Sequence, residues 1–313
     1  MISVGLLVQP GFQVLSLACA SVFEMANLSA GQTLYEVRML SEDGGMVRAS
    51  IGTLIETRPL ARVRLDTLVV VGVPKPVPSS ACVVDFVRRS PQRFRRVSAI
   101  CTGAFILGEA GLLDGRRATT HWLYARELQR LYPQAHVEED RIYIIDGSIW
   151  TSAGMTAGID LALGMLEKDF GADLAREVAR KMVVYHRRSG GQSQHSALLE
   201  MDAKSDRIQS ALAYAKRNLR KPLTVEDLAD AVHLSPRQFS RAFRSETGKS
   251  PAKAVEHLRL EAARLMIEQT HHPIDVVATE TGFADRERMR RAFLRAFGQP
   301  PQVIRRNARA EAA

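Results

Sequence analysis

One cysteine of the chain stands where a nucleophile would stand. Cys101 ends the apolar run Val97–Ile100 and is followed at once by Thr102, Gly103 and a helix-like segment. A strand that delivers a side chain into a sharp turn before a helix forms a nucleophile elbow, and the N-terminus of a helix favours a thiolate. The pattern predicts an exposed, reactive sulfur above a sheet. The alternative is a small buried cysteine in a strand–helix turn.

A thiolate nucleophile also needs a positioned acid or base. His121, at the start of a later helix, is the candidate partner of Cys101, although such a histidine also caps helices or serves as a hydrogen-bonded structural residue. The other candidate is Glu24. We therefore expect Cys101, Thr102, Gly103 and His121 to line a small-molecule pocket without catalysis, and we expect no cofactor and no metal.

The three cysteines of the chain, Cys19, Cys82 and Cys101, show no paired spacing. This argues against a disulfide scaffold and against a zinc site. It leaves open a thiol-based redox sensor in which Cys101 pairs with Cys19 or Cys82.

A second kind of chemistry lies in the last hundred residues, where one helical unit occurs twice. The copies run from Leu228 to Pro251 and from Val277 to Pro301, and each contains an arginine-rich helix. At an offset of 50 residues, Arg241, Ala242, Phe243, Gly248 and Pro251 match Arg291, Ala292, Phe293, Gly298 and Pro301. The offset is 49 before the turn, so the second copy has one extra residue there. Two helix-turn-helix units predict two helices that enter DNA major grooves.

Each unit, at about 224–245 and 274–297, has its own start and stop signals. Ser235 and Pro236 begin the second helix of the first unit, and Gly248 ends it. A single charged helix face is usually only solvated, but two in register favour nucleic acid. The side chains expected at DNA are Ser235, Arg237, Gln238, Arg241 and Arg244, and then Arg286, Glu287, Arg288, Arg290, Arg291 and Arg295.

The charge distribution agrees with this interpretation. Residues 205–313 hold 20 Lys and Arg against 13 Asp and Glu, whereas residues 1–204 hold 23 against 21. Neutralising phosphates requires such a local excess. Between the units, residues 251–269 predict one amphipathic helix about 28 Å long at 1.5 Å per residue. Its expected inner face is Ala254, Leu258, Ala262, Leu265 and Met266.

Residues 205–307 resemble the DNA-binding domain of the AraC family. The run GFADRERMRRAF, from Gly282 to Phe293, carries the most specific part of the likeness. The resemblance implies a seven-helix domain that binds two successive major-groove segments of double-stranded promoter DNA. It also implies a transcriptional activator that acts with RNA polymerase, as a homodimer.

The first 185 residues alternate strand-like and helix-like segments. Strands are expected at 2–8, 35–41, 68–71 and 97–100, with a hairpin at 141–151. Helices are expected at 14–28, 79–89, 104–110, 122–131, 157–168 and 172–185. This alternation predicts an α/β fold, a doubly wound parallel sheet between helices, followed by the all-α domain. Residues 186–204, which begin with a Gly/Ser/Gln-rich stretch, are the expected linker.

The N-terminal region resembles the class I glutamine amidotransferase-like, PfpI-type fold, in the GlxA-like subgroup that is fused to AraC-type domains. The segments 98–122, 151–167 and RRSGGQSQHS carry the likeness, which places Cys101 at the nucleophile position. Protease-like relatives have His after this Cys, where Thr102 stands here. Hydratase-like relatives have an acid in the first helix, where Ser16 stands. These departures favour a ligand pocket, and the resemblance implies amino-acid-derived or quaternary-amine effectors.

The composition fits a cytoplasmic protein of two domains. A chain of 313 residues with 46% apolar residues can build two cores. No segment approaches the ~18 uncharged apolar residues of a membrane span. We therefore expect a cytoplasmic DNA-binding regulator with a metabolite-sensing first domain. The alternative is a Cys101-dependent hydrolase or hydratase that carries a DNA-binding module.

Overall fold

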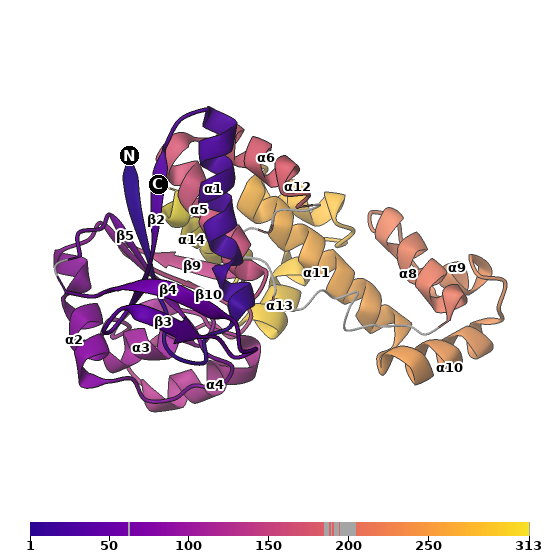
Figure 1. Ribbon diagram of the computed structural model, residues 1–313. Helices are drawn as coiled ribbons and strands as arrows, with labels where there is room; N and C mark the ends of the chain where they lie inside the picture. Colours follow the sequence, from indigo (N-terminus) through magenta and orange to yellow (C-terminus); the bar gives the residue numbers. More distant parts are fainter. Residues whose placement is uncertain (62, 185–187, 189, 191–193, 195–204, 313) are drawn as a thin grey trace. The chain divides into compact units, whose positions relative to one another are not determined.

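The structure, a computed structural model, describes residues 1–61, 63–184, 188, 190, 194 and 205–312 (Figure 1). The chain divides into two compact units, Met1–Gly190 and Gly191–Ala313. Most of the expected linker, residues 186–204, lies outside the described residues.

The first unit is built on an eight-stranded, mostly parallel sheet. Its strands are β1 (Ile2–Leu7), β2 (Tyr35–Ser41), β3 (Gly45–Arg48), β4 (Leu54–Pro59), β5 (Thr67–Val71), β6 (Arg96–Ile100), β9 (Tyr143–Asp146) and β10 (Ile149–Ser152). The order is β3-β4-β2-β1-β5-β6-β10-β9, and only the edge strands β3 and β9 pair antiparallel with their neighbours. Two short strands, β7 (Arg117–Ala118) and β8 (His136–Val137), form a separate parallel pair.

Helices cover both faces of the sheet, as expected (Figure 1). They are the 3-10 helices η1 (Val14–Leu17) and η2 (Ser90–Gln92) and the α-helices α1 (Ala18–Ala30), α2 (Ala81–Arg89), α3 (Gly103–Glu109), α4 (Trp122–Leu131), α5 (Ala157–Phe170) and α6 (Ala172–Lys181). Successive strand residues alternate between the two cores: Leu6 packs with α1, α5 and α6, whereas Leu7 packs with α2, α3 and α4. The predicted doubly wound α/β class is confirmed.

The hairpin of β3 and β4 was not among the expected strands. Most of its residues are exposed or half-buried, with only Val47 and Thr57 buried. A strand that buries so little lacks the apolar alternation by which strands are recognised in a sequence.

The second unit contains, in its described part, seven helices. They are α8 (Asp206–Arg217), α9 (Val225–Asp230), α10 (Pro236–Thr247), α11 (Pro251–Gln269), α12 (Ile274–Glu280), α13 (Arg286–Phe297) and α14 (Pro301–Ala312). They enclose two small cores, one around Phe239 and Phe243 and one around Met289 and Phe293. The predicted all-α domain with two helix-turn-helix units is confirmed.

The helix α11 has the expected bounds, but its inner face differs from the prediction. Ala254 and Leu258 are buried as expected, in the first core. Ala262, Leu265 and Met266 are only half-buried. The second core instead takes Leu260, Ala263 and Ile267, because α11 serves two cores on different sides rather than one continuous stripe. Among the described residues, no helix is long and apolar enough to cross a membrane.

Candidate DNA-binding surface and candidate effector site

The first exposed arginine-rich helix, α10, is defined by its capping residues. The hydroxyl of Ser235 accepts the backbone N–H of Gln238, whose side-chain oxygen accepts the N–H of Ser235 at 3.2 Å. Pro236 occupies the first turn, and Gly248 ends the helix with φ of +68°. The rings of Phe239 and Phe243 stack 5.4 Å apart in the core. One face of α10 is thereby buried and the opposite face is left to solvent.

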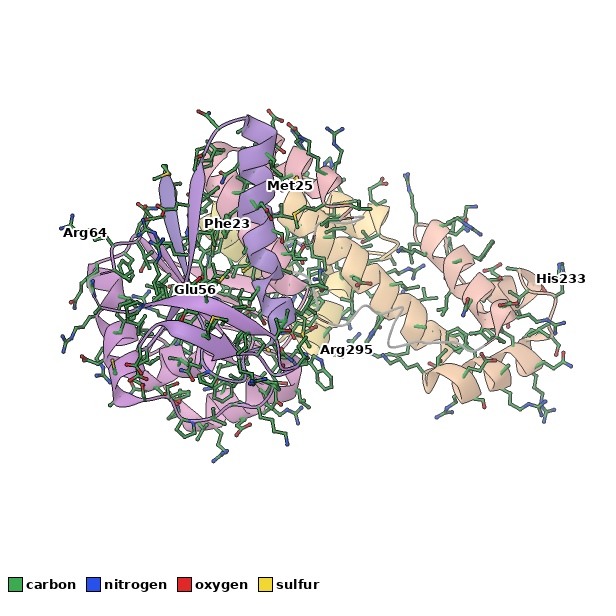
Figure 2. The ribbon with its side chains drawn as sticks, viewed as in Figure 1. Phe23, Met25, Glu56, Arg64, His233 and Arg295 are labelled. Carbon is green, nitrogen blue, oxygen red and sulfur yellow. The ribbon has the colours of Figure 1, made fainter. Side chains whose placement is uncertain are left out.

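The helix α13 is capped and packed in the same way in the second helix-turn-helix unit. A carboxylate oxygen of Asp285 accepts the N–H of Arg288 at 2.7 Å, and Gly298 ends the helix with φ of +66°. Phe293 and Phe297 pack 5.1 Å apart, so the arginines of α13 point outward; Arg295 is labelled in Figure 2.

The side chains expected at DNA lie at the surface of these two helices. All of them are exposed except Arg290, which is half-buried. In α10, the side chains of Arg237, Arg241 and Arg244 make no hydrogen bond or ion pair within the described residues. In α13, by contrast, Glu287 binds Arg290 through two hydrogen bonds of 2.8 and 2.9 Å. Which of these residues contact DNA stays a prediction.

A basic groove of about 760 Å³ lies between the two helix-turn-helix units. Among its lining residues are Arg220, Arg259, Arg288, Arg291 and Arg295, against a single acidic residue, Glu256. Five guanidinium groups around one groove create a positive potential suited to a polyanion. The sequence interpretation included three of these arginines and missed Arg220 and Arg259, which lie outside the repeated units.

Cys101 has the backbone of a nucleophile elbow, with φ of +57° directly after β6. Its amide donates to Ser152 of β10 at 3.0 Å. A side chain at Gly103 would overlap the carbonyl of Val70, and one at Gly154 would overlap Cys101 itself. The predicted sharp turn is confirmed, and the neighbouring backbone closes tightly around it.

The expected exposed thiolate is wrong. Cys101 is only 4% exposed, and burial raises the pKa of its thiol to about 11, which the N–H of Thr102 offsets only in part. Cys19 is also buried, with a pKa raised to about 12, mainly by burial. All three cysteines are free thiols. Redox-sensing cysteines have low pKa values and solvent access, so this geometry disfavours the redox alternative.

The candidate partners of Cys101 lie at the start of α4 and within α1. His121 caps α4, since its Nδ1 accepts the N–H of Leu123 at 3.3 Å. Its neighbour Thr120 donates to the Cys101 carbonyl at 2.8 Å, so His121 adjoins the turn, and its role as a partner of the sulfur stays a prediction. Glu24 lies on the exposed side of α1. Among the described residues, no group of three or more potential metal ligands occurs.

Three buried side-chain atoms of the first domain have no partner, and one of them belongs to Ser152, which pairs with the Cys101 turn. The hydroxyls of Ser16 and Ser152 and the side-chain oxygen of Gln13 have no hydrogen-bond partner within the described residues. Ser16 and Ser152 are fully buried. Thr102, by contrast, both donates to and accepts from the backbone of Val73 at 2.6 and 2.9 Å. Buried polar groups are nearly always satisfied, so orphaned atoms mark a place for a polar ligand or ordered water.

Comparison with known proteins decides the family. Residues 17–168 match the DJ-1/PfpI family and residues 228–307 match a helix-turn-helix domain family. The chain is 31% identical over 310 residues to the HTH-type transcriptional regulator GbdR of Pseudomonas aeruginosa, across 96% of this chain and 83% of GbdR. The chain belongs to the GlxA-like subgroup of AraC-family transcriptional regulators.

This regulator has two further informative neighbours. A crystal structure of an AraC family transcriptional regulator from Pseudomonas putida shares the fold, with a TM-score of 0.54 and 22% identity, and covers 58% of this chain and 100% of that one. An isonitrile hydratase of Pseudomonas putida is 44% identical over 95 residues, 30% of this regulator and 40% of the enzyme. The first unit therefore has a fold that regulators and enzymes share.

One contact of this regulator was missed in the sequence. Arg188, in the segment expected to be linker, binds the buried carboxylate of Asp160 in α5 through its backbone N–H at 2.8 Å and its guanidinium at 2.7 Å. The guanidinium also donates to Thr156 at 2.8 Å. The sequence shows only a pair of arginines inside a Gly/Ser-rich stretch, and this pattern does not indicate which carboxylate they bind.

Proposed function

We propose that this transcriptional regulator reads two successive major-groove segments of promoter DNA with α10 and α13. We also propose that its first unit binds a small effector beside Cys101 without converting it. Activation through RNA polymerase, homodimerisation and a cytoplasmic location belong to the same proposal, on the strength of the family resemblance.

The observation that carries the DNA proposal is the pairing of two exposed arginine-rich helices in one compact unit. Arg237 and Arg241 of α10 are unpaired within the described residues, and Arg288 and Arg291 of α13 face the basic groove. Arginine recognises guanine edges and phosphates with two parallel hydrogen bonds. A fixed pair of such helices suits two stretches of one duplex.

The observation that carries the effector proposal is a set of buried, uncharged polar atoms without partners in the domain that holds Cys101. Ser16, Ser152 and Gln13 supply two hydroxyl groups and one amide oxygen that have no partner in the described structure. Hydroxyl groups can donate to a carboxylate, and an amide oxygen can accept from an ammonium group. This chemistry supports an amino-acid-derived effector. A buried, neutral thiol supports binding rather than turnover.

The contact of Arg188 gives the effector a route to the DNA-binding unit. Gly154 packs against Cys101, and α5 begins three residues later with Asp160 in its first turn. Arg188 attaches to this turn and precedes the second unit in the chain. A ligand that shifts the Cys101 turn would shift the anchor of the chain that leads to the DNA-binding helices.

The likeness to isonitrile hydratase favours a second candidate, an enzyme that uses Cys101. It requires an acid or base within reach of the sulfur. At the position where hydratase-like relatives carry an acid, this regulator has Ser16, which is buried and uncharged. We therefore place the enzyme second.

The test uses the full chain and genomic fragments that it selects from solution. Pools of amino-acid-derived compounds and quaternary amines are added, and both fragment binding and the mass of each compound are followed. Ser16→Ala should remove the response to the active compound and preserve binding of DNA, since its hydroxyl has no partner among the described residues. Ser98→Ala is the matched control, because that buried hydroxyl already donates to Leu68 at 3.2 Å.

Two results would refute the proposal. One is that Ser16→Ala responds to the active compound as the wild type does. The other is consumption of the compound well beyond one equivalent, lost in Cys101→Ser, which would establish the enzyme.

A further inference from the structure

The two helix-turn-helix units meet at a backbone contact of unusual closeness. Gly282, in the turn between α12 and α13, has φ of +78°, and a side chain there would overlap the carbonyl oxygen of Leu219. Leu219 belongs to the segment between α8 and α9, which leads into the first helix-turn-helix unit and packs against its core. The turn of the second helix-turn-helix unit therefore rests on the segment that leads into the first unit.

Arg259 of α11 fastens the same contact. Its guanidinium donates to the carbonyl of Leu219 at 3.1 Å and to that of Lys221 at 2.8 Å. A side chain at Gly282 would also lie 2.7 Å from Nε of Arg259. We call Leu219, Lys221, Arg259 and Gly282 the junction. Arg259 of α11 thus holds the segment that leads into the first helix-turn-helix unit against the turn of the second unit.

The equivalent turn in the first helix-turn-helix unit indicates that Gly282 is required by the contact with Leu219 and not by the shape of the turn. His233, which matches Gly282 at the offset of 49 residues, also has a left-handed backbone, with φ of +55°. It is exposed and points away from its unit (Figure 2). A left-handed turn here therefore tolerates a side chain. Gly282 differs because the carbonyl of Leu219 leaves no room for one.

The basic groove opens beside the junction. It is lined by Arg220, from the segment that leads into the first helix-turn-helix unit, and by Arg288 of the second unit. Burial, together with the charge of Arg288, lowers the pKa of Arg259. Positive charge is thus concentrated where the two units meet, as a phosphate backbone that crosses between them would require.

We propose that the junction sets the spacing of α10 and α13, and with it the number of base pairs between the two DNA segments that this regulator accepts. The inference rests on the proposed DNA-binding role of these helices. Each inserted base pair moves one segment by about 3.4 Å and rotates it by about 35° around the duplex. Two helices held as one rigid body cannot follow that displacement, whereas loosely joined helices can.

The test measures the affinity of the full chain for one selected genomic fragment and for duplexes with one base pair deleted, or one or two inserted, between the two protected stretches. The wild type should prefer the natural spacing by at least about tenfold, because both helices then bind as one. Arg259→Gln removes the positive charge and the paired hydrogen bonds to the carbonyls of Leu219 and Lys221. It should reduce the preference for the natural spacing to about twofold or threefold. Gly282→Ala should act in the same direction.

The matched control is His233→Ala, which changes an exposed side chain in the equivalent turn, and it should keep the wild-type preference. Circular dichroism shows whether each variant is folded, and Arg259→Lys replaces any variant that is not. Wild-type protein that binds the fragment with equal affinity at all spacings would overturn the proposal. So would an Arg259→Gln variant with the full preference. Failure to bind any fragment would instead refute the proposed DNA-binding helices themselves.

Discussion

The protonation of Cys101 separates a binding site from a catalytic one. Burial raises the pKa of this thiol from 9.0 to about 11. Two pKa units mean roughly a hundredfold less thiolate near neutral pH than an unperturbed thiol has. At pH 8 about one molecule in a thousand would carry the reactive form. We therefore expect slow alkylation of Cys101 whose rate rises about tenfold for each pH unit.

The assay labels the full chain with iodoacetamide between pH 6.5 and 10 and quantifies the Cys101 peptide by mass spectrometry. N-acetylcysteine in the same tube corrects for the pH dependence of the reagent. Burial of Cys101 slows its alkylation at every pH. The informative quantity is therefore the slope of the labelling rate against pH, and not the absolute rate. A rate that levels off below pH 8 would show a thiolate at neutral pH and refute the reasoning, restoring the enzyme and redox alternatives.

The remaining predictions concern stability, coupling and charge. The buried carboxylate of Asp169 binds Arg96, which is 6% exposed, and Arg95, which is 50% exposed. Asp169→Ala should cost about 3–5 kcal/mol because Arg96 is left buried and unpaired, whereas Arg95→Ala should cost less than about 1 kcal/mol; urea unfolding of the first unit, followed by the fluorescence of its two tryptophans, measures both. Since the folded pKa of Asp169 is lowered, this contribution should be present above the ordinary carboxyl pKa and lost as pH falls through the lowered one, which the same unfolding at decreasing pH would show; equal stability at pH 3 and pH 6 would contradict it. Arg188→Gln should keep DNA affinity without effector and weaken the response to effector, as titrations of the selected fragment would show; an unchanged response would remove Arg188 from the route. DNA affinity should fall steeply with salt because arginines replace counterions, and a flat salt titration would argue against phosphate contacts.

Local signals predicted most of the elements of this regulator. The helix α10 begins at Pro236 because Ser235 caps it, and it ends at Gly248. Both boundaries could be predicted from the types of these residues. The helices on both faces of the sheet followed from the alternation of strand-like and helix-like segments, and Leu6 and Leu7 pack into the two resulting cores. The sharp turn at Cys101 was legible as well, because a glycine follows an apolar run.

The features that the sequence did not predict depend on residues far apart in the chain. The burial of Cys101 depends on Gly154 and on β10, which no pattern near residue 101 records. The contact between Arg188 and Asp160 joins a linker-like stretch to α5. In the same way, Gly282 looks like any helix-turn glycine until Leu219 is placed against it. Long-range packing decides each of these cases.

The central claim is that α10 and α13 each read one stretch of a single duplex. Footprinting of the full chain on its tightest selected fragment tests this directly, with wild type, Arg241→Ala and Arg291→Ala. The wild type should protect two stretches about one helical turn apart on one face of the DNA. Each variant should lose about 1–3 kcal/mol and relax base preference in one stretch only, a different one for each helix. If both variants affect the same stretch, or neither changes the footprint, the account is contradicted.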